Sequence, residues 1–142
     1  MEKRPSRRNV LFLCTGNACR SQMAEGWARA LQSQQFEPYS AGIEKHGLNP
    51  YAVKVMAEAG VDISGHYSKT LDDLADIELD LVVAVCDHAQ QNCPVLSPTA
   101  SMLGMPFDDP PKLAIGLSDE NDILDCYRQV RDDIRLFVEG MA

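Results

Sequence analysis

The sequence lacks three features that would place it in common functional classes. It contains no apolar stretch that approaches the ~20 residues a membrane-spanning helix requires. Its 13 Lys and Arg residues are outnumbered by 21 Asp and Glu residues, so no broad basic face for nucleic acid or for an anionic membrane is expected. The apolar run that follows the basic start, VLFLC, is too short for a signal peptide core. We therefore expect a cytoplasmic protein.

Paired CxxC spacings are also missing, although the chain has cysteines at positions 14, 19, 86, 93 and 126. A structural zinc site usually needs such pairs, and a secreted disulfide framework is typical of shorter chains. We expect no metal site and no bound cofactor. Cys126 lies at helical spacing with apolar residues and is expected in the core, and Cys19 is expected to be structural.

Strand-like and helix-like segments alternate along the chain. Apolar runs predict strands over 10–14, 37–42, 80–86 and 101–107, and helical periodicity predicts helices over 21–34, 49–60, 70–79 and 118–141. Asn49 and Ser118 are the expected N-caps of the second and last of these helices. With 142 residues and 45% hydrophobic content, the chain suits one domain over residues 1–142. The predicted fold is α/β, a small parallel four-stranded sheet with helices on both faces.

A Cys-Gly-Asn-Arg-Ser pattern lies between the first strand and the first helix. Cys14 ends the strand, and Arg20 and Ser21 open the helix. A loop at a helix N-terminus directs backbone N–H groups and the positive end of the helix dipole at an anion, and arginine can bind two oxygens of it. The same field is expected to lower the pKa of Cys14, which makes it a nucleophile, and Ser21 is expected to donate a hydrogen bond to that thiolate or to the leaving sulfur. The expected oxyanion-binding residues are Thr15, Gly16, Asn17, Ala18, Cys19 and Arg20.

The segment VLFLCTGNACRSQMAEG resembles the phosphate-binding loop of the low-molecular-weight tyrosine phosphatase fold, and more closely that of the thioredoxin-coupled arsenate reductases built on it. The segments YSAGIEKHGLNPYAV, VDISGHYSK, DLVVAVCDHAQQNCPVL and FDDP follow in family order. The resemblance implies that Cys14 is the nucleophile, that Arg20 binds the oxyanion, and that Asn17 and Ser21 shape the loop. It also implies Asp109 as the general acid because this residue directly precedes proline, and the sequence leaves the adjacent Asp108 open.

Two further cysteines separate a reductase from a phosphatase. In the resembling reductases, a residue matching Cys86 attacks the Cys14–arsenic adduct and releases arsenite, and one matching Cys93 moves the disulfide to Cys86–Cys93, where thioredoxin reduces it. If 86–93 were helical, the two Cα atoms would lie about 10 Å apart. A disulfide tolerates roughly 7 Å, so this segment must unwind for the bond to close.

Arsenate reduction is therefore the expected activity, with arsenate and thioredoxin as partners and a monomer as the expected state. A phosphatase is the alternative, but the segment that begins with the acid, DPPK, includes no aromatic side chain. A non-catalytic anion sensor would need neither Cys86 and Cys93 together nor Asp109. A mycothiol- or glutaredoxin-linked donor remains an alternative to thioredoxin.

A last expectation concerns potassium. Some reductases of this class bind potassium behind the loop through residues matching Asn17, Glu25 and Ser40, together with a threonine and an aspartate where this chain has Tyr67 and Lys69. The ammonium of Lys69 is a compact positive charge. We expect it either to take the place of the cation beside Glu25 or to point to solvent.

Overall fold

The computed structural model describes residues 7–86 and 100–141. These residues form a four-stranded sheet with the order β2-β1-β3-β4, in which every neighbouring pair is parallel. The strands are β1 (Arg8–Cys14), β2 (Phe36–Gly42), β3 (Leu81–Ala84) and β4 (Ser101–Gly104). The predicted α/β class with a parallel four-stranded sheet is confirmed.

Strand β1 lies inside the sheet, between β2 and β3, and its residues 10–14 are apolar without interruption. Residues 10–14 are all buried, as expected for a parallel strand that is covered on both faces. Cys14 pairs in register with Gly42 at the end of β2, and Leu13 pairs with Ala84 at the end of β3. The carboxyl ends of these strands therefore meet at one edge of the sheet, where ligands bind in folds of this kind.

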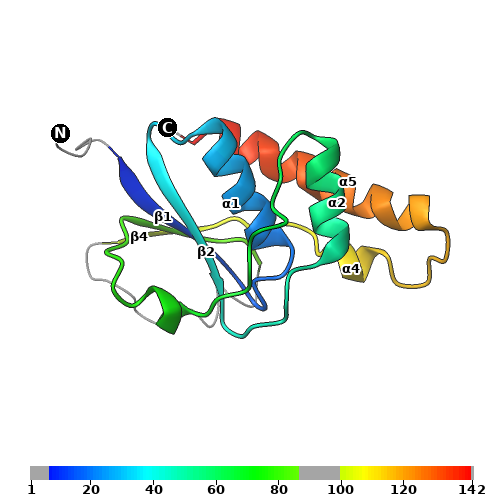
Figure 1. Ribbon diagram of the computed structural model, residues 1–142, viewed down its shortest axis with the longest axis horizontal. Helices are drawn as coiled ribbons and strands as arrows, with labels where there is room; N and C mark the ends of the chain where they lie inside the picture. Colours follow the sequence, from blue (N-terminus) through cyan, green and yellow to red (C-terminus); the bar gives the residue numbers. More distant parts are fainter. Residues whose placement is uncertain (1–6, 87–99, 142) are drawn as a thin grey trace.

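The longer helices gather on one side of the sheet (Figure 1). They are α1 (Arg20–Leu31), α2 (Pro50–Glu58) and α5 (Glu120–Glu139), and two shorter elements are η1 (Leu71–Leu74) and α4 (Pro110–Leu113). Trp27 connects α1 to α5 through a hydrogen bond, because its Nε1 donates to the carbonyl of Arg131 at 3.1 Å. No helix within the described residues is long and apolar enough to cross a membrane.

Two helix predictions need correction. The segment predicted as a helix over 70–79 contains only the 3₁₀ turn η1, because Leu71, Leu74 and Ile77 pack against the core at a spacing of three, the period of a 3₁₀ helix. Helix α5 is capped by Asp119, whose side chain accepts from the N–H of Asn121, and not by Ser118. By contrast, Asn49 caps α2 as predicted, with its side chain accepting from the N–H of Tyr51 and Ala52.

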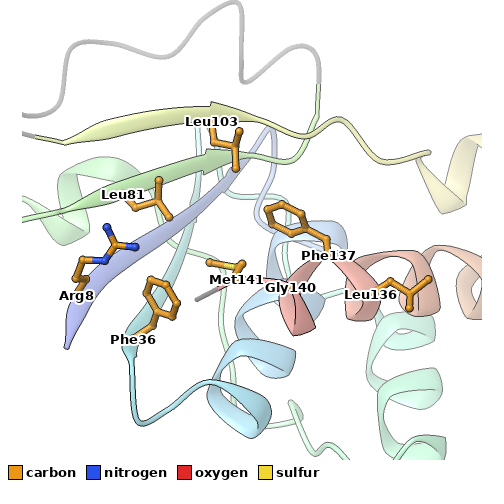
Figure 2. A pocket seen from close by; sticks show the side chains of 8 residues that line it. All are labelled: Arg8, Phe36, Leu81, Leu103, Leu136, Phe137, Gly140 and Met141. Atoms are coloured by element: carbon orange, nitrogen blue, oxygen red, sulfur yellow. The ribbon is translucent and has the colours of Figure 1, made fainter. Parts of the chain in front are cut away.

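An apolar cavity of about 410 Å³ lies at the opposite edge of the sheet, where the strands begin. Figure 2 shows its lining side chains, which come from the strands and from the end of α5: Arg8, Phe36, Leu81, Leu103, Leu136, Phe137, Gly140 and Met141. The guanidinium carbon of Arg8 lies 5.2 Å from the centre of the Phe36 ring and covers one side of it. This cavity is separate from the edge where Cys14 lies.

Candidate active site

The segment 14–20, called the oxyanion loop below, connects β1 to α1. Its first residue, Cys14, is the last residue of β1, and Arg20 is the first residue of α1. Cys19 occupies the N-cap position and has no side-chain capping bond, so the first turn of α1 presents backbone N–H groups at the end of this loop. The sequence-predicted nucleophile and arginine are therefore placed on opposite ends of one loop at the carboxyl edge of the sheet.

The carbonyl groups of the oxyanion loop point towards the segment 43–49. The carbonyls of Cys14, Thr15, Gly16 and Ala18 accept from the N–H groups of Ile43, Glu44, His46 and Asn49 at 3.1, 2.9, 2.9 and 2.9 Å. In a trans peptide the N–H points opposite to the carbonyl of the same peptide unit. The N–H groups of residues 15, 16, 17 and 19 are therefore directed away from the segment 43–49, in the arrangement that binds an anion.

Asn17 shapes the loop from its buried side. Its φ of 51° lies in the left-handed region, which few residues other than glycine adopt. Its Oδ1 accepts from the N–H of Lys69 at 2.7 Å and from Nε2 of Gln22 at 3.0 Å, and its carbonyl accepts from Oγ of Ser68 at 2.8 Å. These bonds stabilise an otherwise unfavourable backbone conformation.

Ser21 takes part in the same buried network. Its Oγ accepts a hydrogen bond from Nδ2 of Asn17 at 2.9 Å, and the side chain is fully buried. The hydroxyl acts there as an acceptor and still carries its own proton.

Gly42 allows the sheet to approach the oxyanion loop. A methyl group at this position would lie 2.7 Å from the backbone N of Asn17, 2.7 Å from the carbonyl oxygen of Thr15 and 2.6 Å from that of Glu44. All three are backbone atoms, which cannot rotate away as a side chain can. The close contact between the end of β2 and the loop thus requires glycine.

Two cavities meet at Arg20. One, of about 360 Å³, is lined by the loop and by His46, Asn49, Asp109 and Pro111. The other, of about 730 Å³, is lined by Thr15, Arg20, Cys86, Pro106, Phe107, Asp108, Asp109, Lys112 and Leu113. Thr15, Arg20 and Asp109 line both, so the predicted arginine and the predicted acid face the same space.

The segment that carries the acid holds Arg20 in place. Nη1 of Arg20 donates to the carbonyl of Phe107 at 3.0 Å, and Nη2 lies 3.7 Å from a carboxylate oxygen of Asp109. Asp109 precedes α4 at its N-cap position, and Pro110 and Pro111 begin that helix. Asp108 is more exposed than Asp109 and lines only the larger cavity. This geometry favours Asp109 over Asp108 as the acid.

Cys14 and Cys86 are in contact below the oxyanion loop. Both thiols are buried, they share a hydrogen bond, and Oγ1 of Thr15 lies 3.4 Å from Sγ of Cys86. The bond with Cys86 and the burial of the thiol raise the pKa of Cys14 well above that of an ordinary cysteine, whereas the charge of Arg20 lowers it. The expectation of a lowered pKa for Cys14 is therefore wrong for this arrangement, because it considered the field of the loop and of Arg20 but neither the burial of the thiol nor its hydrogen bond with Cys86.

The remaining cysteines fall into three situations. Cys19 is buried, and burial raises its pKa to about 12, in keeping with a structural role. Cys126 was expected in the core but is only partly buried against it. Cys93 lies outside the described residues, and the expected Cys86–Cys93 disulfide stays a prediction.

Lys69 lies behind the oxyanion loop and does not point to solvent. Its Nζ is 4.0 Å from Oε1 of Glu25 and donates to the carbonyl of Tyr67 at 3.2 Å. Oγ of Ser40 donates to the same carboxylate oxygen at 2.5 Å. Of the two expectations for this lysine, the position beside Glu25 is confirmed.

Two residues near the loop were missed by the sequence analysis. Gln22 is fully buried, and its Nε2 donates to Asn17 and to the carbonyl of Tyr67. His46 lines the smaller cavity. The signal for His46 was its place in the segment after β2, since that segment leaves the sheet at the same edge as Cys14.

Within residues 7–86 and 100–141, no group of three or more His, Cys, Asp or Glu side chains is arranged to hold a metal ion.

Comparison with known proteins places this site in a family. The chain is 46% identical over 133 residues to an arsenate reductase of Halalkalibacterium halodurans, covering 94% of each protein. It is 40% identical over 134 residues to arsenate reductase 2 of Staphylococcus epidermidis, covering 94% of this chain and 95% of that one.

Solved structures agree with these relatives. An arsenate reductase in the phosphate binding state superposes with a TM-score of 0.78 at 32% identity, covering 94% of this chain and 95% of that one. A low molecular weight protein tyrosine phosphatase from T. tengcongensis superposes with a TM-score of 0.73 at 27% identity, covering 93% and 95%. The family model of low molecular weight phosphotyrosine protein phosphatases matches residues 9–137, and the chain belongs to this family.

Proposed function

We propose that this protein reduces arsenate to arsenite, with Cys14 as the nucleophile and Cys86 as the second thiol. The observation that carries the proposal is the contact of these two buried thiols below the oxyanion loop. A phosphatase needs only one thiol, whereas the reduction of As(V) to As(III) takes two electrons, which two cysteines supply when they form a disulfide. The arsenate reductases among the relatives support the same assignment.

In the first step, Sγ of Cys14 attacks arsenic while an oxygen leaves as water. The N–H groups of residues 15, 16, 17 and 19 and the guanidinium of Arg20 bind the remaining oxygens, and Asp109 donates a proton to the departing one. Because the pKa of Cys14 is raised, its thiol also loses a proton as it attacks, and this proton restores the one that Asp109 gave up, so that one thiol and one hydrogen arsenate ion yield the adduct and one water. The product is a Cys14–arsenate thioester-like adduct, with arsenic still in the As(V) state.

In the second step, Sγ of Cys86 attacks Sγ of Cys14. The S–As bond breaks and its electron pair stays on arsenic, which leaves as arsenite with the proton of the Cys86 thiol, while Cys14 and Cys86 form a disulfide. Two thiols are thereby oxidised by two electrons and arsenic is reduced by two. Ser21 and Asn17 keep the loop in shape around the sulfur that is attacked.

Regeneration is proposed to use Cys93 and thioredoxin. Sγ of Cys93 attacks Cys86 and releases Cys14 as a thiol, and the resulting Cys86–Cys93 disulfide is reduced by the dithiol of thioredoxin. We further propose that the protein is cytoplasmic and monomeric, that it has one domain over residues 1–142, and that it needs no bound cofactor. Its partners are arsenate and thioredoxin.

A residual phosphatase activity is a second expectation. The first step on a phosphate monoester needs the same nucleophile, loop and acid, and the family includes phosphatases. The residues that follow Asp109, two prolines and a lysine, offer no aromatic surface for a phenyl ring. We therefore expect hydrolysis of aryl phosphates to be slow compared with arsenate reduction.

A coupled assay tests the proposal. NADPH consumption and arsenite formation are measured with arsenate, thioredoxin and thioredoxin reductase, beside the hydrolysis of p-nitrophenyl phosphate. Arsenite formation with turnover supports a reductase. Efficient ester hydrolysis without arsenite would identify a phosphatase instead, and neither activity would favour a sensor of anions.

A further inference from the structure

His46 is in direct contact with the oxyanion loop. Its N–H donates to the carbonyl of Gly16 at 2.9 Å, and its ring lies against the α-carbon of that glycine. A methyl group at Gly16 would lie 2.1 Å from Nδ1 and 2.4 Å from Cγ of the imidazole. The absence of a side chain at Gly16 is what lets the ring approach so closely.

The ring is held in this position from its other edge. Nε2 of His46 lies 2.8 Å from Oε1 of Glu44, and the N–H of Glu44 donates to the carbonyl of Thr15 at 2.9 Å. Glu44 and His46 are therefore fixed both to each other and to neighbouring residues of the oxyanion loop. About half of the His46 side chain is exposed, so its contact with Gly16 depends on this tether and not on burial in the core.

The opposite side of the loop is fixed by different residues. Asn17, with its left-handed φ, is held by Gln22, Ser68 and Lys69. The peptide units between Thr15 and Asn17 thus lie between a buried polar network and the imidazole of His46. These are the units whose N–H groups are directed at an anion.

We propose that His46, tethered by Glu44, is a positioning residue that holds the Gly16 and Asn17 peptide units in their anion-binding orientation. The proposal deepens the proposed function and rests on it for the identity of the substrate. His46 acts through the backbone of the loop and not on the reacting atoms. It shares the smaller cavity with Arg20 and Asp109, and Glu44 is the charged group bonded to its ring.

The test uses inorganic phosphate as the probe and four purified variants of the full chain. Phosphate affinity is measured as competitive inhibition of p-nitrophenyl phosphate hydrolysis and as the rise in melting temperature on adding phosphate. For His46→Ala we expect affinity to fall about tenfold, since a small misplacement of binding groups can cost up to about 100-fold. The melting temperature without phosphate should change little, because the side chain is half-exposed, and any fall in kcat should come together with the loss of affinity, because the same N–H groups bind the oxyanion in both cases.

The other variants distinguish the hydrogen bond between Glu44 and His46 from the negative charge of Glu44. Glu44→Gln keeps an oxygen that accepts from Nε2–H and should retain most of the affinity, whereas Glu44→Ala should lose part of it. Lys45→Ala is the matched control, because the exposed ammonium of this neighbour lies 3.4 Å from the carboxylate of Asp73. If His46→Ala binds phosphate as the unmodified protein does, the proposal is wrong. It is also wrong if His46→Ala lowers kcat alone, or lowers the melting temperature equally with and without phosphate. Phosphate binding needs no electron donor, so the proposed reductase activity can fail while this test still gives its answer.

Discussion

The ammonium of Lys69 lies 4.0 Å from a carboxylate oxygen of Glu25, and both side chains are almost entirely buried behind the oxyanion loop. Ser40 donates to the same oxygen, and the N–H of Lys69 donates to Asn17. The lysine therefore contributes a positive charge and a backbone bond to the network that holds Asn17. Nζ also lies 4.7 Å from the centre of the Tyr67 ring, a favourable position for a cation.

This pair predicts indifference to potassium. A potassium ion beside Glu25 would be repelled by the ammonium of Lys69, so exchanging sodium for potassium at constant ionic strength should leave activity and melting temperature unchanged. Lys69→Asp removes that charge and adds a carboxylate, and it should create a potassium response. A potassium-specific stabilisation of the unmodified protein would contradict the prediction.

Gly42→Ala should destabilise the fold by about 1–3 kcal/mol, the usual cost of forcing an extra carbon into a packed region. The methyl group would press on the backbone of Thr15, Asn17 and Glu44, so phosphate binding should weaken as well. Urea unfolding measures the first effect. Gly65→Ala is the control, because a methyl group there meets nothing within 4 Å. Equal stability of the two variants would show that the contact at Gly42 is not tight.

Cys86→Ala should lower the pKa of Cys14, because the hydrogen bond with Cys86 is the largest of the causes that raise it. A lower pKa means more thiolate at neutral pH, so Cys14 should react faster with iodoacetamide, by about tenfold or more. Mass mapping of the Cys14 peptide across a pH series measures this, with Cys126→Ala as the control. An unchanged alkylation profile would mean that Cys86 does not govern the Cys14 thiol.

Asp109→Asn should slow the first step by about 10²–10⁴-fold, the typical contribution of a general acid. Phosphate affinity should change little, since the loop and Arg20 provide the anion contacts. Asp108→Asn is the matched control, because Asp108 does not line the smaller cavity. If Asp108→Asn causes the larger loss in single-turnover arsenate reduction, the acid is Asp108.

The sequence predicted well those parts of the fold that depend on local patterns. The apolar run of β1, the Asn-Pro start of α2 and the strand–loop–helix order around Cys14 are each encoded by adjacent residues. Helix periodicity failed over 70–79, because packing of Leu71, Leu74 and Ile77 at a spacing of three decides the conformation there. The short helix α4 was missed, although Asp109-Pro110 is a typical helix start.

Features of the site that depend on contacts between distant residues could not be read from the sequence. The pKa of Cys14 depends on a thiol 72 positions later, and the position of Gly16 depends on a histidine of the segment that follows β2. Lys69 was recognised only as an alternative, because its direction depends on where β2 places Ser40 relative to Glu25.

The most direct test of reduction by Cys14 and Cys86 is a single-turnover measurement on Cys93→Ser with arsenate and no electron donor. We expect one arsenite per protein, followed by arrest, and mass mapping of the arrested protein should find Cys14 joined to Cys86 by a disulfide. Cys14→Ser should release no arsenite under the same conditions. Release of arsenite without a Cys14–Cys86 disulfide, or from Cys14→Ser, would contradict the mechanism.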